Sequence, residues 1–123
     1  MEPIARKILI VDDSATEMAI MTNSLKAGGF DVVTATNGEE ALLRLESDRP
    51  DVVVLDVIMP GKNGFQVCRQ IRSDARWASL PIVMVTSKDQ ESDRFWGMKQ
   101  GASDYITKPF DPSNLLETVR RFA

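Results

Sequence analysis

Two adjacent carboxylates close the first apolar run of the chain. The stretch ILIVDDS places Asp12 and Asp13 directly after Ile8–Val11, with Ser14 behind them. Like charges this close repel each other, so a buried strand that ends in both carries an electrostatic cost. One explanation is a solvated turn in which Asp13 or Ser14 caps the next helix. The other is a divalent cation that lies between the carboxylates and removes the repulsion.

Other reactive side chains close the later apolar runs. Asp56 ends one run, Thr86 and Ser87 end another, and Lys108 follows the weaker run DYIT. Magnesium prefers carboxylate, water and phosphate oxygens as ligands, and a lysine across the pocket would pair with a phosphoryl group. Each residue alone is also typical of a turn or a surface position. Complementary groups at four run ends together favour a site for magnesium and a phosphoryl group.

Composition excludes several classes of protein. The 123 residues contain no histidine, which rules out Ser-His-Asp and Cys-His catalysis and a phosphohistidine carried by this chain. Cys68 is the single cysteine, so no internal disulfide can form, and a buried thiol in a reducing cytoplasm fits. The net charge of -3 favours neither nucleic acid nor an anionic membrane as a partner. No apolar run approaches the roughly 20 residues of a membrane-spanning helix.

Short β-branched runs alternate with helical periodicity along the whole chain, which predicts one domain over residues 1–123. The runs are ILIV, DVVTAT, VVVLDV, IVMVT and DYIT. The helical faces between and after them are Met18, Met21 and Leu25; Ala41, Leu42 and Leu45; Phe65, Cys68 and Ile71; Phe95 and Met98; and Leu115, Leu116 and Val119. This alternation predicts a doubly wound α/β fold with a parallel sheet and helices on both faces. Ligands of such sheets bind at the carboxyl ends of the strands, where the acids, hydroxyls and lysine would converge.

Four motifs, in order and at family spacing, resemble the receiver domain of bacterial response regulators (CheY-like). They are ILIVDDS, DVVVLDVIMPGKNG, IVMVTS and GASDYITKPF, and the resemblance covers essentially the whole chain. It implies a flavodoxin-like fold with five parallel strands in the order 2-1-3-4-5 and five helices. It also implies a signalling switch that catalyses only its own phosphorylation and dephosphorylation.

The resemblance implies a role for each site residue. Asp56 would accept a phosphoryl group from the phosphohistidine of a partner kinase. Asp12 and Asp13, with Asp56 and the backbone carbonyl of Ile58, would bind magnesium. Lys108 would pair with the phosphoryl oxygens.

The resemblance further implies a switch and a partner surface. Thr86 would bond the phosphoryl group, and Tyr105 would change rotamer in response. The Lys108–Pro109 bond would be cis, as are only about 5–6% of X-Pro bonds. A monomer would present the fourth helix, fifth strand and fifth helix to a downstream protein.

Two positions depart from the usual family pattern. If Phe95 and Met98 face the core, Trp96 lies about 100° away on the helix and near the surface. There Trp96 either covers a neighbouring side chain or anchors a partner. Ile58 puts an apolar side chain where chemotaxis proteins often carry a polar one, and it could shield the phosphoryl group from water.

Other functions fit the sequence less well. An aspartyl phosphatase would need a second acid two residues after Asp56, where Ile58 stands, and VDDSATE lacks the glycines of a nucleotide loop. The segment TSKDQESDRFWGMKQGA is similar to stand-alone receivers of chemotaxis-like and twitching-motility systems. The alternative is a receiver that belongs to a longer response regulator or a hybrid kinase with a separate output domain.

Overall fold

The apolar runs of the sequence form one parallel sheet, which a computed structural model describes over residues 6–123. The strands are β1 (Lys7–Val11), β2 (Asp31–Ala35), β3 (Val52–Leu55), β4 (Ile82–Thr86) and β5 (Asp104–Thr107). The helices are α1 (Ala15–Ala27), α2 (Gly38–Asp48), α3 (Gly64–Arg72), α4 (Glu91–Lys99) and α5 (Pro112–Phe122), with a short 3-10 helix η1 (Ala75–Trp77) before β4. The strand order is β2-β1-β3-β4-β5, which confirms the predicted fold.

The strand register brings distant acids to one edge of the sheet. β1 pairs with β3 up to Val11 opposite Leu55, so the next residue of each strand is an aspartate. The amide of Asp12 donates to the Ala35 carbonyl at 3.1 Å, and that of Asp56 donates to the Val11 carbonyl at 3.0 Å. These bonds hold both aspartates in place at the carboxyl edge.

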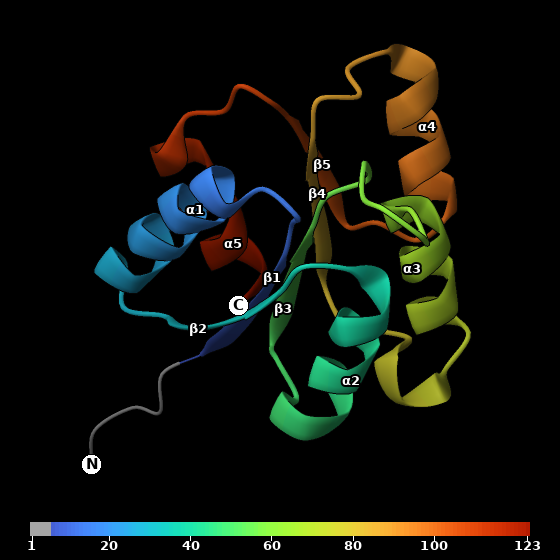
Figure 1. The fold of residues 1–123 in the computed structure, drawn as a ribbon, viewed down its shortest axis with the longest axis horizontal. Coiled ribbons are helices and arrows are strands. Elements are labelled where there is room, and N and C mark those ends of the chain that lie inside the picture. Colours follow the sequence, from blue (N-terminus) through green and yellow to red (C-terminus); the bar gives the residue numbers. More distant parts are fainter. Residues whose placement is uncertain (1–5) are drawn as a thin grey trace.

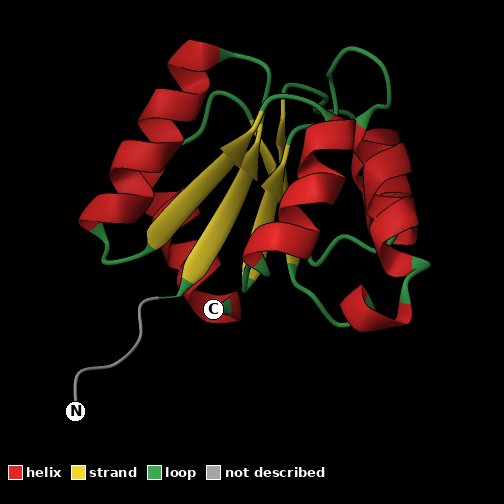
Figure 2. Cartoon of the chain, turned by 60° about the horizontal axis from the view of Figure 1, so that its bottom comes forward, coloured by secondary structure: helices red, strands yellow, loops and turns green. Residues whose placement is uncertain are grey.

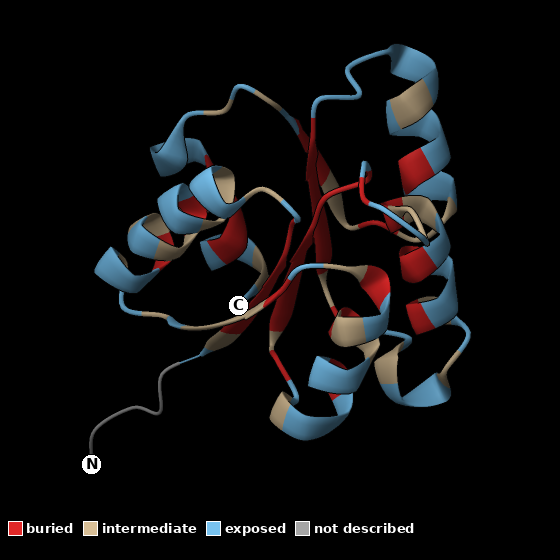
Figure 3. Cartoon of the chain, viewed as in Figure 1, coloured by how far each residue is buried: buried red, intermediate tan, exposed pale blue. Residues whose placement is uncertain are grey.

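Helices cover both faces of the sheet (Figures 1 and 2). On one face, Met21 and Leu25 of α1 and Leu115 of α5 pack against β1 residues such as Ile8. On the other, α2 and α3 pack against alternate strand residues such as Leu9. The central strands β1, β3 and β4 are buried between these layers (Figure 3), as the lack of polar alternation in most runs predicts, whereas the edge strand β2 is partly exposed.

The outer surface of α4 corrects one prediction. Phe95 and Met98 are 64% and 42% exposed, so the prediction that they face the core is wrong, and Trp96 beside them is 50% exposed. The buried residue of this helix is Gly97. A Cβ atom on Gly97 would lie 3.0 Å from the ring of Tyr105, so only glycine fits against the sheet without displacement. The helix therefore approaches the sheet through its backbone and turns its large apolar side chains outward.

No helix within residues 6–123 is long and apolar enough to cross a membrane.

Candidate functional site

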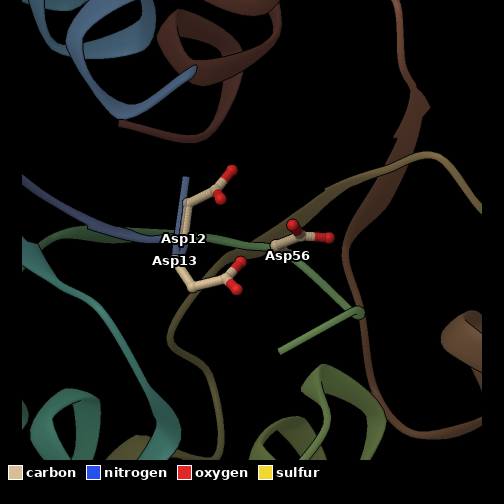
Figure 4. A group of neighbouring side chains, drawn as sticks. All are labelled: Asp12, Asp13 and Asp56. Atoms are coloured by element: carbon tan, nitrogen blue, oxygen red, sulfur yellow. The ribbon is translucent and has the colours of Figure 1, made fainter. Parts of the chain in front are cut away.

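Three carboxylates gather at the carboxyl edge of the sheet (Figure 4). Asp12 and Asp13 follow β1, Asp56 follows β3, and one oxygen from each lies within 4.8 Å of the others. Asp12 and Asp56 are buried, whereas Asp13 is exposed. A set of oxygen donors at this separation suits a hard divalent cation such as magnesium.

The turn after β1 fixes the direction of the Asp12 side chain. Ser14 is the N-cap of α1, and its hydroxyl accepts from the amide of Glu17 at 3.3 Å. The amide of Ser14 in turn donates to Asp12 Oδ1 at 2.8 Å. The cap is therefore Ser14 rather than Asp13, which leaves the Asp13 carboxylate available to the acid cluster.

Lys108 provides the positive charge of the site. Its ammonium donates to Asp12 Oδ2 at 2.9 Å and to Asp56 Oδ2 at 3.1 Å, and it forms a third ion pair with Glu17. Burial alone would lower the pKa of Lys108, but hydrogen bonds with Glu17 and Asp12, together with the charge of Asp56, raise it above its ordinary value. Lys108 is therefore a fixed cation in direct contact with both buried acids.

Asp56 is a buried carboxylate with two different neighbours. Oδ1 accepts from the amide of Ile58 at 3.1 Å, while Oδ2 faces Lys108. Burial raises the pKa of Asp56 above its ordinary value, and the charge of Lys108 opposes that rise. A partly desolvated carboxylate beside a fixed cation is suited to attack an anionic phosphoryl group, because the cation offsets the repulsion.

Thr86 and Tyr105 meet at the backbone of a third residue. The Thr86 hydroxyl accepts from the amide of Lys88 at 3.3 Å, and the Tyr105 hydroxyl donates to the Lys88 carbonyl at 2.7 Å. Both side chains are buried, and burial raises the pKa of Tyr105 to about 12. Thr86 and Tyr105 are therefore linked through the backbone of Lys88.

An open pocket surrounds the acid cluster and Lys108. Its rim includes Glu17, Ser87, Pro109 and the half-exposed side chain of Ile58. Thr86 lies behind this lining, while Ser87 faces the pocket. The Lys108–Pro109 peptide bond is cis.

Sequence reasoning missed Glu17. Its signal was the pattern Ser14-Ala-Thr-Glu17, since Ser-x-x-Glu is typical of a capping box at a helix start. In a capping box the glutamate returns to the N-cap amide, but here the Ser14 amide is bonded to Asp12. Glu17 pairs with Lys108 instead.

Trp96 lies outside this site. It borders a shallow hollow between α3 and α4, beside Phe65 and Arg69. Its ring is available to solvent rather than folded into the core.

Known proteins share both the sequence pattern and the fold. The chain is 49% identical to Protein PilH of Pseudomonas aeruginosa, over 92% of this chain and 93% of that protein. It is 43% identical to the alkaline phosphatase synthesis transcriptional regulatory protein PhoP of Bacillus subtilis, over 94% of this chain but only 47% of that longer protein. The chemotaxis response regulator CheY4 of Vibrio cholerae superposes with a TM-score of 0.91 at 33% identity, over 98% of this chain and 100% of that one.

The match to the response regulator receiver domain extends over residues 8–120, and so includes every member of the acid cluster, Lys108, Thr86 and Tyr105. On this match, and on the fold, the chain belongs to the family of response regulator receiver domains.

Proposed function

We propose that this chain, as a single receiver domain over residues 1–123, is a signalling switch phosphorylated on Asp56. The observation that carries the proposal is the position of the Asp56 carboxylate, buried between two further acids and the ammonium of Lys108. One Asp56 oxygen attacks the phosphorus of a kinase phosphohistidine. The new P–O bond forms as the P–N bond breaks, and the electron pair of that bond returns to the imidazole. The product is an acyl phosphate, which water later hydrolyses to restore the carboxylate.

Magnesium fits this acid cluster. Asp12, Asp13, Asp56 and the carbonyl of Ile58 would hold it, and it would neutralise the charge that accumulates around the transferred group. Lys108 contributes from the other side of Asp56, where its ammonium pairs with phosphoryl oxygens. The chain therefore acts mainly by positioning groups and offsetting charge, as a signalling protein rather than an enzyme with a separate substrate.

The switch begins at Thr86. When the Thr86 hydroxyl turns toward a phosphoryl oxygen, it leaves the amide of Lys88, whose carbonyl holds Tyr105. The Tyr105 ring also lies against α4 at Gly97. Phosphorylation therefore shifts the population of conformations of α4, β5 and α5, the face that meets a downstream protein.

The pathway we propose is chemotaxis-like, with twitching motility as the favoured example. Support comes from the 49% identity with Protein PilH and from the structural likeness to a chemotaxis response regulator. The phosphodonor is a sensor histidine kinase, and the switch acts as a monomer. Its compartment is the cytoplasm, because the free thiol of Cys68 fits a reducing environment.

A second context is favoured by one comparison. The chain resembles about half of a longer transcriptional regulatory protein, so it could be the receiver of such a protein. The length of its natural reading frame decides between the two contexts.

Two substitutions test the acceptor and the switch separately. Asp56→Asn keeps the size of the side chain but removes the nucleophile, so labelling by a small phosphodonor should stop. Thr86→Ala removes one neutral hydrogen bond, worth about 1 kcal/mol, so labelling should persist. The Trp96 fluorescence response to the phosphodonor should then be largely lost. Equal labelling of both variants would reject Asp56 as the acceptor, and a full fluorescence response in Thr86→Ala would reject the switch.

The metal assignment has its own test. Asp13→Ala removes the exposed member of the acid cluster and relieves repulsion, so the domain should remain folded. Magnesium-dependent labelling should be abolished in this variant. Undiminished labelling would reject Asp13 as a magnesium ligand.

A further inference from the structure

Glu17 occupies a donor of Lys108 that the phosphorylated state needs. An ammonium has three N–H donors, and in this structure Asp12, Asp56 and Glu17 each pair with the Lys108 ammonium. A phosphoryl group on Asp56 brings new acceptor oxygens toward the same ammonium. Lys108 can bond them only as it gives up bonds to carboxylates.

The contact with Glu17 is the easiest of the three to release. Asp12 is fully buried and also accepts from the amide of Ser14, so its separation from Lys108 would strand a buried charge. The Glu17 side chain is 39% exposed at the pocket rim, where water can replace the ammonium. Glu17 also sits on the first turn of α1, from which a rotation of its own side chain moves the carboxylate into solvent.

We propose that Glu17 is a positioning residue that acts as a reversible counterion of Lys108. In the unphosphorylated protein it shares the ammonium with Asp12 and Asp56, and on phosphorylation it is displaced by the phosphoryl oxygens. This inference rests on the proposed function, since it concerns the same acceptor site.

Removal of the Glu17 charge should have opposite effects on two ligands of the site. Without Glu17, Lys108 interacts more strongly with Asp12 and Asp56, and the site loses one negative charge. Magnesium, which needs those carboxylates and is attracted by negative charge, should bind more weakly. An anionic phosphoryl group, which needs Lys108 and is repelled by Glu17, should bind more tightly.

Glu17→Gln and Glu17→Ala test this sign pattern, with beryllofluoride as the phosphoryl analogue. The glutamine variant keeps the shape of the side chain, and both variants remove its charge. Magnesium affinity is measured alone by NMR titration, and beryllofluoride affinity is measured by calorimetry in saturating magnesium. A partly exposed ion pair predicts about a two- to fivefold loss for magnesium and about a two- to fivefold gain for beryllofluoride.

Glu40→Gln is the matched control. Glu40 holds the same third position of α2 that Glu17 holds in α1, after the N-cap Asn37, and its carboxylate accepts from Thr36. The substitution Glu40→Gln removes the same charge as Glu17→Gln, from the start of a helix at the same edge of the sheet. The affinities for magnesium and for beryllofluoride should therefore both match those of the parent protein.

Three results would overturn the inference: unchanged beryllofluoride affinity in Glu17→Gln, a fall in both affinities together, or the same shifts in Glu40→Gln. A parent protein that binds neither magnesium nor beryllofluoride would overturn the proposed function and this inference with it. A parent that binds both, beside an unchanged Glu17→Gln, overturns the inference alone.

Discussion

The carboxyl edge of the sheet buries charge, whereas the outer surface of α4 exposes apolar side chains. At the edge, Asp12 and Asp56 are 1% and 6% exposed, while on α4 Phe95 is 64% exposed. Both regions invert the ordinary distribution of residues, and each inversion costs free energy in the isolated chain. In the function we propose, a cation and a phosphoryl group would relieve the first cost, and contact with another protein would relieve the second. The comparison shows that the two unusual regions of this domain are its two proposed points of contact.

Tyr105 connects these regions. Its hydroxyl donates to the Lys88 carbonyl, and the amide of the same Lys88 donates to the Thr86 hydroxyl. Its ring occupies the space that a side chain on Gly97 would need. The buried inner side of α4 therefore lies against a side chain that is bonded to the loop after Thr86.

The largest effect on stability is expected at Gly97. Gly97→Val would place a side chain against Met84 and the ring of Tyr105, and overpacking of this kind costs about 2 kcal/mol. Denaturant unfolding measures the loss. The control is Ala19→Val on the exposed side of α1, which adds a similar group without a buried neighbour. Equal losses in the two variants would show that α4 does not depend on close contact at Gly97.

Asp56→Asn should raise the free energy of unfolding, in contrast to Gly97→Val. Because burial raises the pKa of Asp56, the folded protein holds a proton there more readily than the unfolded chain does. The ionised carboxylate therefore costs stability, and this cost appears as pH rises from the unfolded pKa through the folded one. In metal-free buffer, the free energy of unfolding of the parent should fall relative to Asp56→Asn over that range.

Asp111→Asn is a control in which the pH dependence of stability should have the reverse sign. Hydrogen bonds from Ser113 lower the pKa of Asp111, so its contribution is present above the unfolded pKa and is lost as pH falls. If the parent gains stability over Asp56→Asn as pH rises, pairing with Lys108 outweighs burial at Asp56.

Ile58→Asn tests whether an exposed apolar side chain at the site has a chemical role. Ile58 is 50% exposed at the pocket rim, where it would hinder water that attacks the acyl phosphate. Loss of that shield should shorten the lifetime of the acyl phosphate by about two- to tenfold. This range corresponds to a fall of up to about 1.4 kcal/mol in the activation free energy of hydrolysis. Ile20→Asn on α1, at a comparable exposure, should leave the lifetime unchanged. An equal or longer lifetime in Ile58→Asn rejects shielding.

The smallest effect on stability is expected from the exposed α4 side chains. Phe95→Ser and Trp96→Ser should each change the free energy of unfolding by no more than about 0.5 kcal/mol, because neither side chain is in the core. Binding of a downstream protein should weaken in the same variants. A loss of about 2 kcal/mol or more, typical of a buried position such as Leu115, would show that these rings support the fold.

The sequence predicted the sheet and most of the site for the same reason. Four of the five apolar runs are followed at once by a polar group of the site, so a parallel sheet places Asp12, Asp56 and Lys108 at one edge without knowledge of side-chain packing. The N-cap remained open between Asp13 and Ser14, because either side chain can accept the required bond.

Two features depended on tertiary contacts and were not predictable from local patterns. Glu17 and Lys108 lie 91 residues apart in the sequence, and their pairing depends on how α1 is oriented over the sheet. The spacing of Phe95 and Met98 suggested a core-facing side for α4, since apolar residues three apart share a helix face. The closeness of Met84 and Tyr105 to the helix backbone makes Gly97 the inner residue instead.

The direction of α5 has a practical consequence for measurement. This helix runs back from the carboxyl edge, and Arg121 near its end pairs with Asp104, the first residue of β5, at 3.1 Å. Figure 2 shows the C-terminus at the end of the sheet opposite the arrowheads of the strands. Ala123 therefore lies at the amino edge of the sheet, on the opposite side of the molecule from the acid cluster. A sensor surface or fluorescent label attached at Ala123 would leave the phosphoryl pocket open to solution, so binding can be followed on an immobilised chain without obstruction of the site.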